Sequence, residues 1–375
     1  MKNNTNRILL LADINSTHIQ KWALALAEKG IEIGLFSFTK LGIDWIKDRE
    51  NIKILFTPAE QDIPKIFSKA IYPFLLPELK RAIKEFKPDI LHAHYASSYG
   101  FVGALSGFHP YIISAWGSDV FNFPKISPLH KWVFKFSLGR ADKICSTSHI
   151  MKEEIKNYTN NDISVIPFGI DMDVYKPFHA HHVFNDDAIV IGTVKALEEK
   201  YGIGYLLDAF ALLRKRARGY CLKLLIVGKG SSEAMLKHKI KELGLEADVV
   251  FTGFIPPAEI PFYQNMLSIG VYPSIDKSES FGVSAVEAMA CEKAVVVSDI
   301  GGLPEVVLGG VTGLIVPAAN ADELAKALEV LVKDEQKRFK LGREGRKRVA
   351  QLYNWENNLA DMMYIYDALT AENSG

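Results

Sequence analysis

The sequence has few cysteines and no long apolar run, and both absences narrow the classes of protein that it can encode. Its 375 residues include three cysteines, Cys145, Cys221 and Cys291, which lie far apart in apolar surroundings. Because they offer neither a disulfide framework nor a CxxC metal motif, we expect a reducing compartment. No apolar run approaches the roughly 18 residues of a membrane span, and the apolar stretch after the polar N-terminus is too short for a signal peptide. The sequence therefore predicts a cytoplasmic protein without a transmembrane segment.

An excess of charge of either sign is also missing. The 44 basic residues are balanced by 44 acidic ones, which gives a formal net charge of zero. Proteins that bind nucleic acid by neutralising phosphates carry a basic excess, so we expect no nucleic-acid partner. Hydrophobic residues at 48% and charged residues at 23% are typical of a folded globular chain.

Apolar runs alternate with segments of helical period along most of the chain. The run Ile8–Ala12 predicts a buried strand, and Ile19–Lys29 predicts an amphipathic helix. The alternation resumes after a linker, Val165–Asp187, which contains prolines, histidines and a glycine and shows no clear periodicity. Strands that alternate with helices form parallel sheets covered on both faces. We therefore predict an α/β protein with two doubly wound domains and a ligand cleft beyond the carboxyl ends of their strands.

The domain boundaries follow from the position of the linker. The predicted N-terminal domain covers residues 1–180, the C-terminal domain covers 181–353, and a last helix over 354–375 could fold back on the first domain.

The segment Glu279–Glu287 carries the most specific chemical pattern. Its two glutamates flank a turn in which Gly282 allows a ligand to approach the backbone and opens a helix. The free amides of a helix N-terminus favour an anion such as phosphate. Carboxylates bind sugar hydroxyls, so the segment suits a nucleotide-sugar. The alternative is that Glu287 is an exposed helix residue and Gly282 a simple turn.

This segment continues into Ala288–Ala290, Val295–Asp299, Gly301–Val306 and Thr312–Pro317. In this order the motifs resemble the retaining glycosyltransferases of family 4. The resemblance extends back through Ile166–Pro167 and Gly169–Asp171, and it is weaker in the N-terminal part. It implies the GT-B fold, in which two Rossmann-like domains face each other across a cleft. It also implies a hexosyltransferase that uses a nucleoside-diphosphate sugar, most often of UDP and next of GDP.

The resemblance assigns donor-binding roles by motif position. Glu279 would contact the hydroxyls of the donor sugar, and Glu287 the ribose. Lys195 and Lys200 match the basic pair that neutralises the diphosphate, although the family more often has arginine first; lysine keeps the charge without the bidentate fork. The other donor-binding candidates are Gly228, Gly230, Phe254, Ile255, Ser280, Phe281, Gly282 and Val283. Without the resemblance, the lysines are surface residues, the glycine pair is a tight turn, and Phe254 and Ile255 belong to a core.

The N-terminal part departs from the family in two places. The loop after the first strand lacks the usual glycines, and Ser16 or Thr17 could cap the next helix instead. Trp116 stands where relatives have a histidine that lines the donor sugar. His92 or His94, at the end of a predicted strand, or His18 could replace that histidine. Of these we group His94 with Glu279, Lys195 and Lys200 as catalytic. The candidates that line the sugar or acceptor are Asn15, Ser16, His18, His92, Trp116 and Asp119. For His92 and His94, a core role is the main alternative; a metal site would need a third ligand that the sequence does not supply nearby.

No Asp-x-Asp motif stands in a setting suited to a divalent metal and a diphosphate, so we expect a metal-independent reaction without a cofactor. Lysines and helix amides would stabilise the negative charge of the leaving diphosphate. The basic and aromatic stretches Lys65–Lys69 and Lys131–Phe136 favour a glycan or lipid-linked acceptor and peripheral contact with the inner membrane surface. The simpler alternative is a helix with buried rings and solvated lysines. We expect a role in bacterial lipopolysaccharide, capsule or exopolysaccharide assembly.

Three other functions stay open. A non-catalytic subunit that binds nucleotide-sugars is compatible with Trp116 and the loop without glycine. A nucleotide-sugar 2-epimerase would need dedicated acid–base residues around C2, and a storage-polysaccharide synthase or phosphorylase fits the resemblance less well. Hydrolysis of the donor separates an enzyme from a binding subunit.

Overall fold

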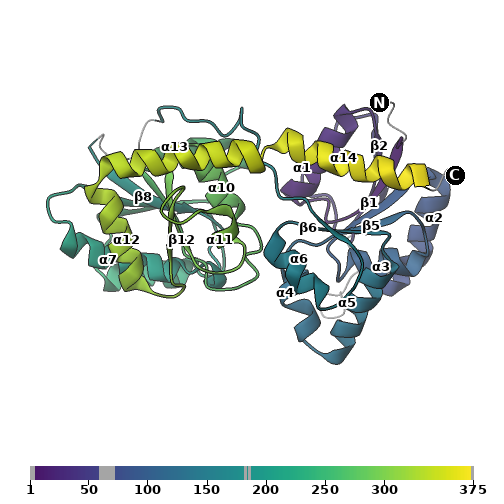
Figure 1. Ribbon diagram of the computed structural model, residues 1–375, viewed down its shortest axis with the longest axis horizontal. Coiled ribbons are helices and arrows are strands. Elements are labelled where there is room, and N and C mark those ends of the chain that lie inside the picture. Colours follow the sequence, from purple (N-terminus) through teal and green to yellow (C-terminus); the bar gives the residue numbers. More distant parts are fainter. Residues whose placement is uncertain (1–4, 59–71, 181–183, 185–186, 373–375) are drawn as a thin grey trace. The chain divides into compact units, whose positions relative to one another are not determined.

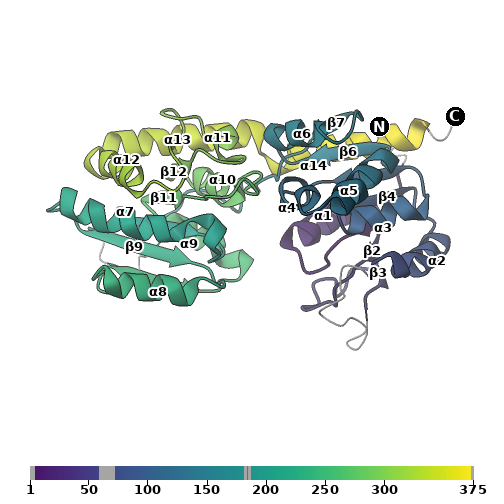
Figure 2. The same cartoon turned by 90° about the horizontal axis from the view of Figure 1, so that it is seen from below.

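The computed structural model describes residues 5–58, 72–180, 184 and 187–372. The chain divides into two units, drawn as ribbons in Figure 1 and Figure 2. Unit 1 comprises Met1–Pro167 and Asn358–Gly375, and unit 2 comprises Phe168–Asn357. The division falls at Pro167, before the predicted residue 180, because Phe168 and Ile170 belong to the apolar core of unit 2. The basic stretch Lys65–Lys69 lies outside the described residues.

Unit 1 has, within the described residues, a seven-stranded sheet in the order β3-β2-β1-β4-β5-β6-β7, and the paired strands are parallel. The strands are β1 (Arg7–Leu11), β2 (Glu32–Phe36), β3 (Ile52–Phe56), β4 (Ile90–His94), β5 (Tyr111–Ser114), β6 (Lys143–Ser146) and β7 (Ile163–Val165). The helices are α1 (Thr17–Glu28), α2 (Leu76–Phe86), α3 (Tyr99–Ser106), α4 (Ser118–Phe121), α5 (Pro128–Arg140), α6 (His149–Lys156) and α14 (Trp355–Glu372). The order reverses between β1 and β4, and such a switch point is where doubly wound sheets bind ligands.

Strand β4 places its side chains alternately on the two faces of this sheet. Leu91 and Ala93 join the apolar cluster that contains residues of α2 and α3. His92 and His94 therefore point to the opposite face, where His92 is hydrogen-bonded to Tyr366 of α14. The last helix of the chain thus covers the face of the sheet that carries the two histidines.

Unit 2 repeats this architecture with six described strands, in the order β10-β9-β8-β11-β12-β13 and again parallel. The strands are β8 (Ile189–Val194), β9 (Leu222–Val227), β10 (Val249–Gly253), β11 (Ile269–Tyr272), β12 (Ala294–Ser298) and β13 (Leu314–Val316). The helices are α7 (Ile203–Arg216), α8 (Glu233–Glu242), α9 (Ile260–Met266), α10 (Val283–Ala290), α11 (Leu303–Val306), α12 (Ala321–Lys333) and α13 (Glu335–Leu352). Strand β12 is buried on both faces, which explains its uninterrupted apolar sequence.

Helix α5 contains the stretch Lys131–Phe136, and its aromatic residues have different environments. Phe134 is fully buried, whereas Trp132 is 55% exposed and lies beside exposed lysines at positions 131 and 135. The alternative of buried rings and solvated lysines therefore holds for Phe134 and not for Trp132. No helix among the described residues has the length and hydrophobicity needed to span a bilayer.

Candidate active site

A lysine and a glutamate form a largely buried ion pair near the carboxyl ends of the strands of unit 2. The Nζ atom of Lys195, which follows β8, lies 2.7 Å from Oε2 of Glu279, and their side chains are 16% and 9% exposed. Ser274 donates a hydrogen bond of 3.2 Å to the same carboxylate oxygen. Burial, the largest single effect, lowers the pKa of Lys195, but Glu279, Tyr201 and Glu287 together outweigh burial, and the net effect raises that pKa. Lys195 is therefore a cation held beside a carboxylate.

Tyr201 brings the second predicted cation to the same place. Nζ of Lys195 lies 4.4 Å and Nζ of Lys200 lies 4.9 Å from the centroid of its ring. The ring also packs against the apolar core of unit 2. Attraction of an ammonium to an aromatic face is worth about 0.5–1 kcal/mol at exposed sites. No sequence motif by itself points to Tyr201, and its position directly after Lys200 is the one local signal.

The predicted glycine pair supports the segment that carries Lys195. A Cβ atom on Gly228, whose φ is +136°, would lie 2.0 Å from the carbonyl oxygen of Lys195, and one on Gly230 would lie 2.4 Å from that of Leu197. The amides of Lys195 and Leu197 donate to the carbonyls of Val227 and Lys229. Only glycine permits this close packing, so both glycines fix the backbone beside the ion pair.

The turn Ser280–Val283 opens helix α10. Gly282, at φ +93°, is its N-cap residue, and the Gly302 amide donates to the carbonyl of Glu279 over 2.8 Å. Phe281 is 1% exposed and packs edge-on against Tyr353, so its ring belongs to the core and only its backbone can face a ligand. Ser280 is buried, and Val283 is half-buried. The first amides of α10 lack carbonyl partners within the helix, which favours an anion there.

Glu287 lies further along α10 and is oriented by two residues that sequence reasoning missed. Tyr175 donates to its Oε1 over 2.9 Å, and the Gln264 side chain donates to its Oε2 over 3.4 Å. Burial, followed by the Glu287 charge, raises the pKa of Tyr175, so this phenol stays a donor. The half-buried Glu287 is therefore not the exposed helix residue of the alternative interpretation. Its partners come from distant segments, and no local sequence pattern points to them.

Phe254 and Ile255 follow β10 and differ in exposure. Phe254 is 70% exposed, whereas Ile255 packs against the core cluster that contains Val227. The amide of Gly228 donates to the carbonyl of Gly253, which holds this segment beside the glycine loop. The alternative that both residues belong to a core is wrong for Phe254.

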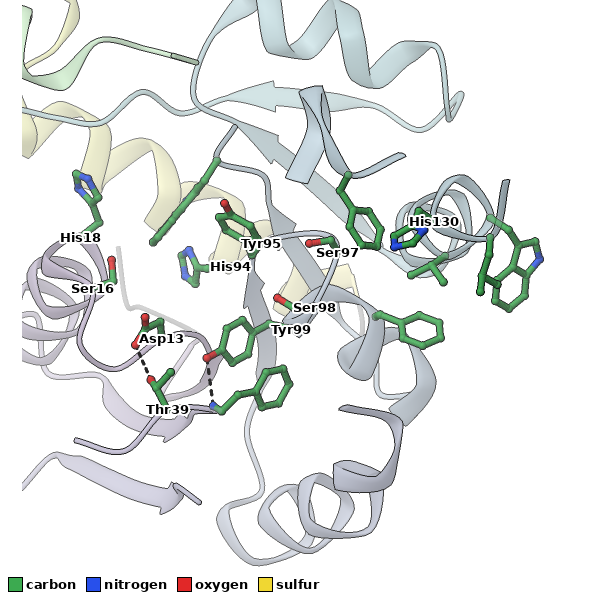
Figure 3. A pocket seen from close by; sticks show the side chains of 17 residues that line it. Asp13, Ser16, His18, Thr39, His94, Tyr95, Ser97, Ser98, Tyr99 and His130 are labelled. Carbon is green, nitrogen blue, oxygen red and sulfur yellow. Dashed lines mark hydrogen bonds between the residues drawn. The ribbon is translucent and has the colours of Figure 1, made fainter. Parts of the chain in front are cut away.

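Unit 1 contains a cavity of about 950 Å³ at the switch point of its sheet. Four predicted sugar-lining or catalytic residues, Ser16, His18, His94 and Trp116, line it. Figure 3 shows Ser16, His18 and His94 together at one side of this cavity, from the loop after β1, helix α1 and the end of β4. Ser16 occupies the N-cap position of α1, but within the described residues its side chain makes no capping hydrogen bond, so the predicted cap is absent.

His94 is the most unusual polar group of this cavity. Its side chain is 3% exposed, and neither ring nitrogen has a hydrogen-bond partner among the described residues. Its ring centroid lies 5.1 Å from that of Trp116. Burial, followed by the charges of His92 and His18, lowers the pKa of His94 well below its usual value. His94 therefore presents a neutral imidazole with one donor and one acceptor.

Three predicted sugar-lining residues do not line the cavity, because the side chain of each is hydrogen-bonded to other groups of the protein. His92 is fully buried, with hydrogen bonds of 2.8 Å to Tyr366 and to Ser114. Asp119 is also fully buried and accepts hydrogen bonds from the amides of residues 96, 116 and 117. Asn15 bonds to the backbone of residues 40 and 42. Among the described residues, no cluster of three potential metal ligands forms around the two histidines.

Comparison with family models gives a match in each of the two units. Residues 175–348 match the model for glycosyl transferases group 1, and residues 7–148 match the model described as glycosyl transferase 4-like. The chain belongs to the group 1 glycosyltransferases. The predicted family resemblance is confirmed, and the chain is a transferase enzyme.

Two curated glycosyltransferases are 25% and 28% identical to this glycosyltransferase over the aligned residues. A D-inositol 3-phosphate glycosyltransferase of Pseudarthrobacter chlorophenolicus is 25% identical over 96% of this chain and 91% of its own length. The capsular polysaccharide biosynthesis glycosyltransferase CapM of Staphylococcus aureus is 28% identical over 64% of this chain and 65% of its own.

Solved structures confirm the predicted α/β fold class of this glycosyltransferase, the GT-B fold. Sucrose-phosphate synthase from Thermosynechococcus elongatus superimposes with a TM-score of 0.85 at 23% identity, over 98% of this chain and 100% of that structure. Anabaena HepE in complex with UDP gives a TM-score of 0.79 at 20% identity, over 97% of this chain and 100% of that structure.

Proposed function

We propose that this glycosyltransferase moves a hexose from a nucleoside-diphosphate sugar to a glycan or lipid-linked acceptor, with retention of configuration and without a metal ion. The observation that carries this proposal is the convergence of Lys195, Lys200 and Glu279 around Tyr201 and Ser274. Two cations beside a carboxylate suit a diphosphate joined to a hydroxylated sugar.

In the proposed reaction, Lys195 and Lys200 neutralise the diphosphate, and the amides of Gly282 and Val283 face its oxygens. Glu279 accepts hydrogen bonds from hydroxyls of the transferred sugar. Glu287, oriented by Tyr175, accepts hydrogen bonds from the ribose. Gly228, Gly230, Phe254 and Ile255 lie on loops next to this cluster and would contact the nucleotide.

The chemical step exchanges one bond at the anomeric carbon. The bond from this carbon to the phosphate oxygen breaks, and a bond to the acceptor oxygen forms on the same face of the sugar. The departing phosphate oxygen takes the proton of the acceptor hydroxyl, so the step needs no separate carboxylate base. Because charge develops on the phosphate as the bond breaks, the lysines stabilise the transition state more than the ground state.

We propose UDP as the nucleotide of the donor sugar, with GDP as the alternative. HepE, which shares the fold, binds UDP. The relationship to CapM supports a role in envelope polysaccharide assembly. Exposed Ile126, Leu129 and Trp132 lie beside exposed lysines on and before α5, and they support peripheral contact with the cytoplasmic face of a membrane.

The test measures the affinity for UDP and the slow hydrolysis of UDP-glucose and GDP-mannose, with and without EDTA. We expect Lys200→Ala to lower hydrolysis more than tenfold, because it removes a cation from the leaving group. Lys215→Ala is the matched control, since Lys215 is an exposed lysine at the far end of α7.

Each other outcome has a defined meaning. Unchanged hydrolysis in Lys200→Ala would remove the site from consideration. UDP binding without hydrolysis or transfer would instead indicate a binding subunit, and a C2-inverted nucleotide-sugar in the product would indicate an epimerase.

A further inference from the structure

The cavity of unit 1 has a polar half and an apolar half. The polar half lies beyond β1, β2 and β4 and is lined by Asp13, Ser16, His18, Thr39 and His94. The apolar half lies against α3, the segment before α5, and α5 itself; its lining includes Phe101, Phe123, Leu129, Trp132 and Val133. Figure 3 shows Asp13, Ser16 and His18 around His94 on one side and His130 of α5 on the opposite side, with Ser97 and Ser98 between them. The division follows the fold, because loops at strand ends supply polar groups and helix faces supply apolar ones.

The charge of the lining limits what the polar half can hold. The lining contains no lysine or arginine among the described residues. Asp13 is the one carboxylate among the lining residues that the structure describes, and it accepts a hydrogen bond from Thr39. A phosphate or diphosphate held here would have no lysine or arginine partner among the described lining residues. Hydroxyl groups, in contrast, can both donate to Asp13 and accept from the surrounding hydroxyls and imidazoles.

His94 supplies the second observation that points to a ligand. Its ring is buried, lines the cavity, and has no hydrogen-bond partner for either nitrogen within the described part of the chain. A buried polar group without a partner is costly, and a ligand hydroxyl can satisfy one or both nitrogens. The cavity is therefore incomplete without a hydroxylated group beside His94.

The apolar half continues to the surface along α5. Leu129 and Trp132 both line the cavity and remain 66% and 55% exposed. Phe101 meets Trp132 and Phe136 edge-on at centroid distances of 6.4 and 5.8 Å, and Trp132 stacks on Phe136 at 5.4 Å. These three rings form a contiguous aromatic wall, of which Phe101 and Trp132 line the cavity. The volume of about 950 Å³ is at the upper end for a small-molecule site, which leaves room for more than a single sugar ring.

We propose that the acceptor is an amphiphile whose uncharged, hydroxyl-bearing head group occupies the polar half beside His94 and whose hydrocarbon chain follows the apolar half along α5. The proposal rests on the proposed transferase function for the reaction itself. The binding site, however, belongs to unit 1 alone, so it can be tested without transfer. The hydrocarbon gains free energy with each methylene removed from water, and the head group gains specificity from His94 and Asp13.

The experiment titrates the full chain by calorimetry with three probes below their critical micelle concentrations. Octyl β-D-glucoside carries both parts, methyl β-D-glucoside carries the head alone, and octyl sulfate carries the same chain with a charged head. We expect octyl glucoside to bind at least tenfold more tightly than either of the other two. Because no bilayer or micelle is present, affinity for a membrane surface cannot produce this result.

Variants assign the binding to the cavity. Val133→Trp fills the apolar half, and Trp132→Ser removes a half-exposed ring from its wall. Each variant is expected to reduce the advantage of octyl over methyl glucoside at least fivefold. Lys131→Ser is the control, because Lys131 is exposed on the same helix and does not line the cavity. Far-UV circular dichroism and melting curves verify that each variant is folded.

Equal binding of octyl and methyl glucoside would overturn the proposal. Equal binding of octyl sulfate and octyl glucoside would also overturn it. So would tighter binding of octyl glucoside than of methyl glucoside that is unchanged in both Val133→Trp and Trp132→Ser. Donor hydrolysis is measured in parallel, in the wild type. If donor is hydrolysed but octyl glucoside binds no more tightly than methyl glucoside, the acceptor proposal fails alone. If octyl glucoside binds more tightly but no donor is hydrolysed, the transferase proposal fails alone.

Discussion

Acid should destabilise unit 1 through His92, by an amount that can be calculated. Burial of His92 between Ser114 and Tyr366 lowers its pKa from 6.5 to about 3. Below pH 6.5 the unfolded chain therefore binds a proton at this position that the native state does not bind. Stability is lost as the pH falls below 6.5, and the loss continues down to about pH 3. Between pH 7 and pH 5 this single residue accounts for about 2 kcal/mol.

The test compares the wild type with His92→Gln in urea unfolding at pH 7 and pH 5. Tryptophan fluorescence reports mainly on unit 1, since Trp22, Trp45, Trp116 and Trp132 lie there and Trp355 lies in unit 2. The transition of unit 1 is analysed separately, because a chain of two units need not unfold in one step. We expect His92→Gln to be less stable at pH 7, and to lose about 2 kcal/mol less than the wild type on acidification.

Tyr366→Phe is the matched control. It removes the hydrogen bond to His92 and leaves the ring buried, so it should lower stability equally at both pH values and keep the full acid dependence. The reasoning is refuted if the wild type and His92→Gln lose the same free energy of unfolding between pH 7 and pH 5.

Three further predictions concern unit 2. Lys195→Met should weaken UDP binding in calorimetry at least tenfold. It should also remove part of the loss of stability of unit 2 at alkaline pH. The pKa of Lys195 is raised from 10.5, so the stability that its charge contributes is present below pH 10.5 and is lost as the pH rises through the higher native pKa. Gly228→Ala should destabilise unit 2 by about 2 kcal/mol or more in urea unfolding, because its Cβ would lie 2.0 Å from a carbonyl oxygen at φ +136°. The control Gly204→Ala, in α7 with its nearest atom at 3.9 Å, should instead be neutral or stabilising by about 0.5–1 kcal/mol. Tyr201→Phe should keep the KM for donor, whereas Tyr201→Leu should raise it several-fold because the ring that holds both ammonium groups is lost; an equal KM in both variants would contradict this role.

The sequence predicts the central elements of the fold well, because short apolar runs between polar turns leave few alternatives. Strands β5, β11 and β12 each coincide with a short apolar run, and β5 and β12 extend one residue further, to a serine. Strands β7 and β13 were missed because they have three residues each, too few for a periodic pattern. Helix α3 was missed because glycine, alanine and serine interrupt its apolar face; Gly103 is needed where Tyr111 packs against it.

The two sites differ in how much the sequence can predict. Glu279, Gly282 and Glu287 belong to one local segment, so their spacing indicated a site for an anion and a sugar, whereas the role of Lys195 came only from the family resemblance. The cavity of unit 1 draws on side chains from the first strand loop to α5, and its aromatic wall exists only once α3 and α5 pack together. For the same reason, sequence periodicity could place His92 and His94 on one face but could not distinguish the ring with two partners from the ring with none.

The route of the chain makes unit 2 an insertion within unit 1. The polypeptide leaves unit 1 after Pro167 and returns at Asn358, whose side chain donates to the carbonyl of Pro167 over 2.8 Å. The exit and re-entry points are thus adjacent, and a short linker joining them would give a closed version of unit 1 with α14 still over His92. A simple truncation at residue 167 would instead strip α14 from the sheet. Exchange of modules between relatives should therefore replace Phe168–Asn357 as one cassette.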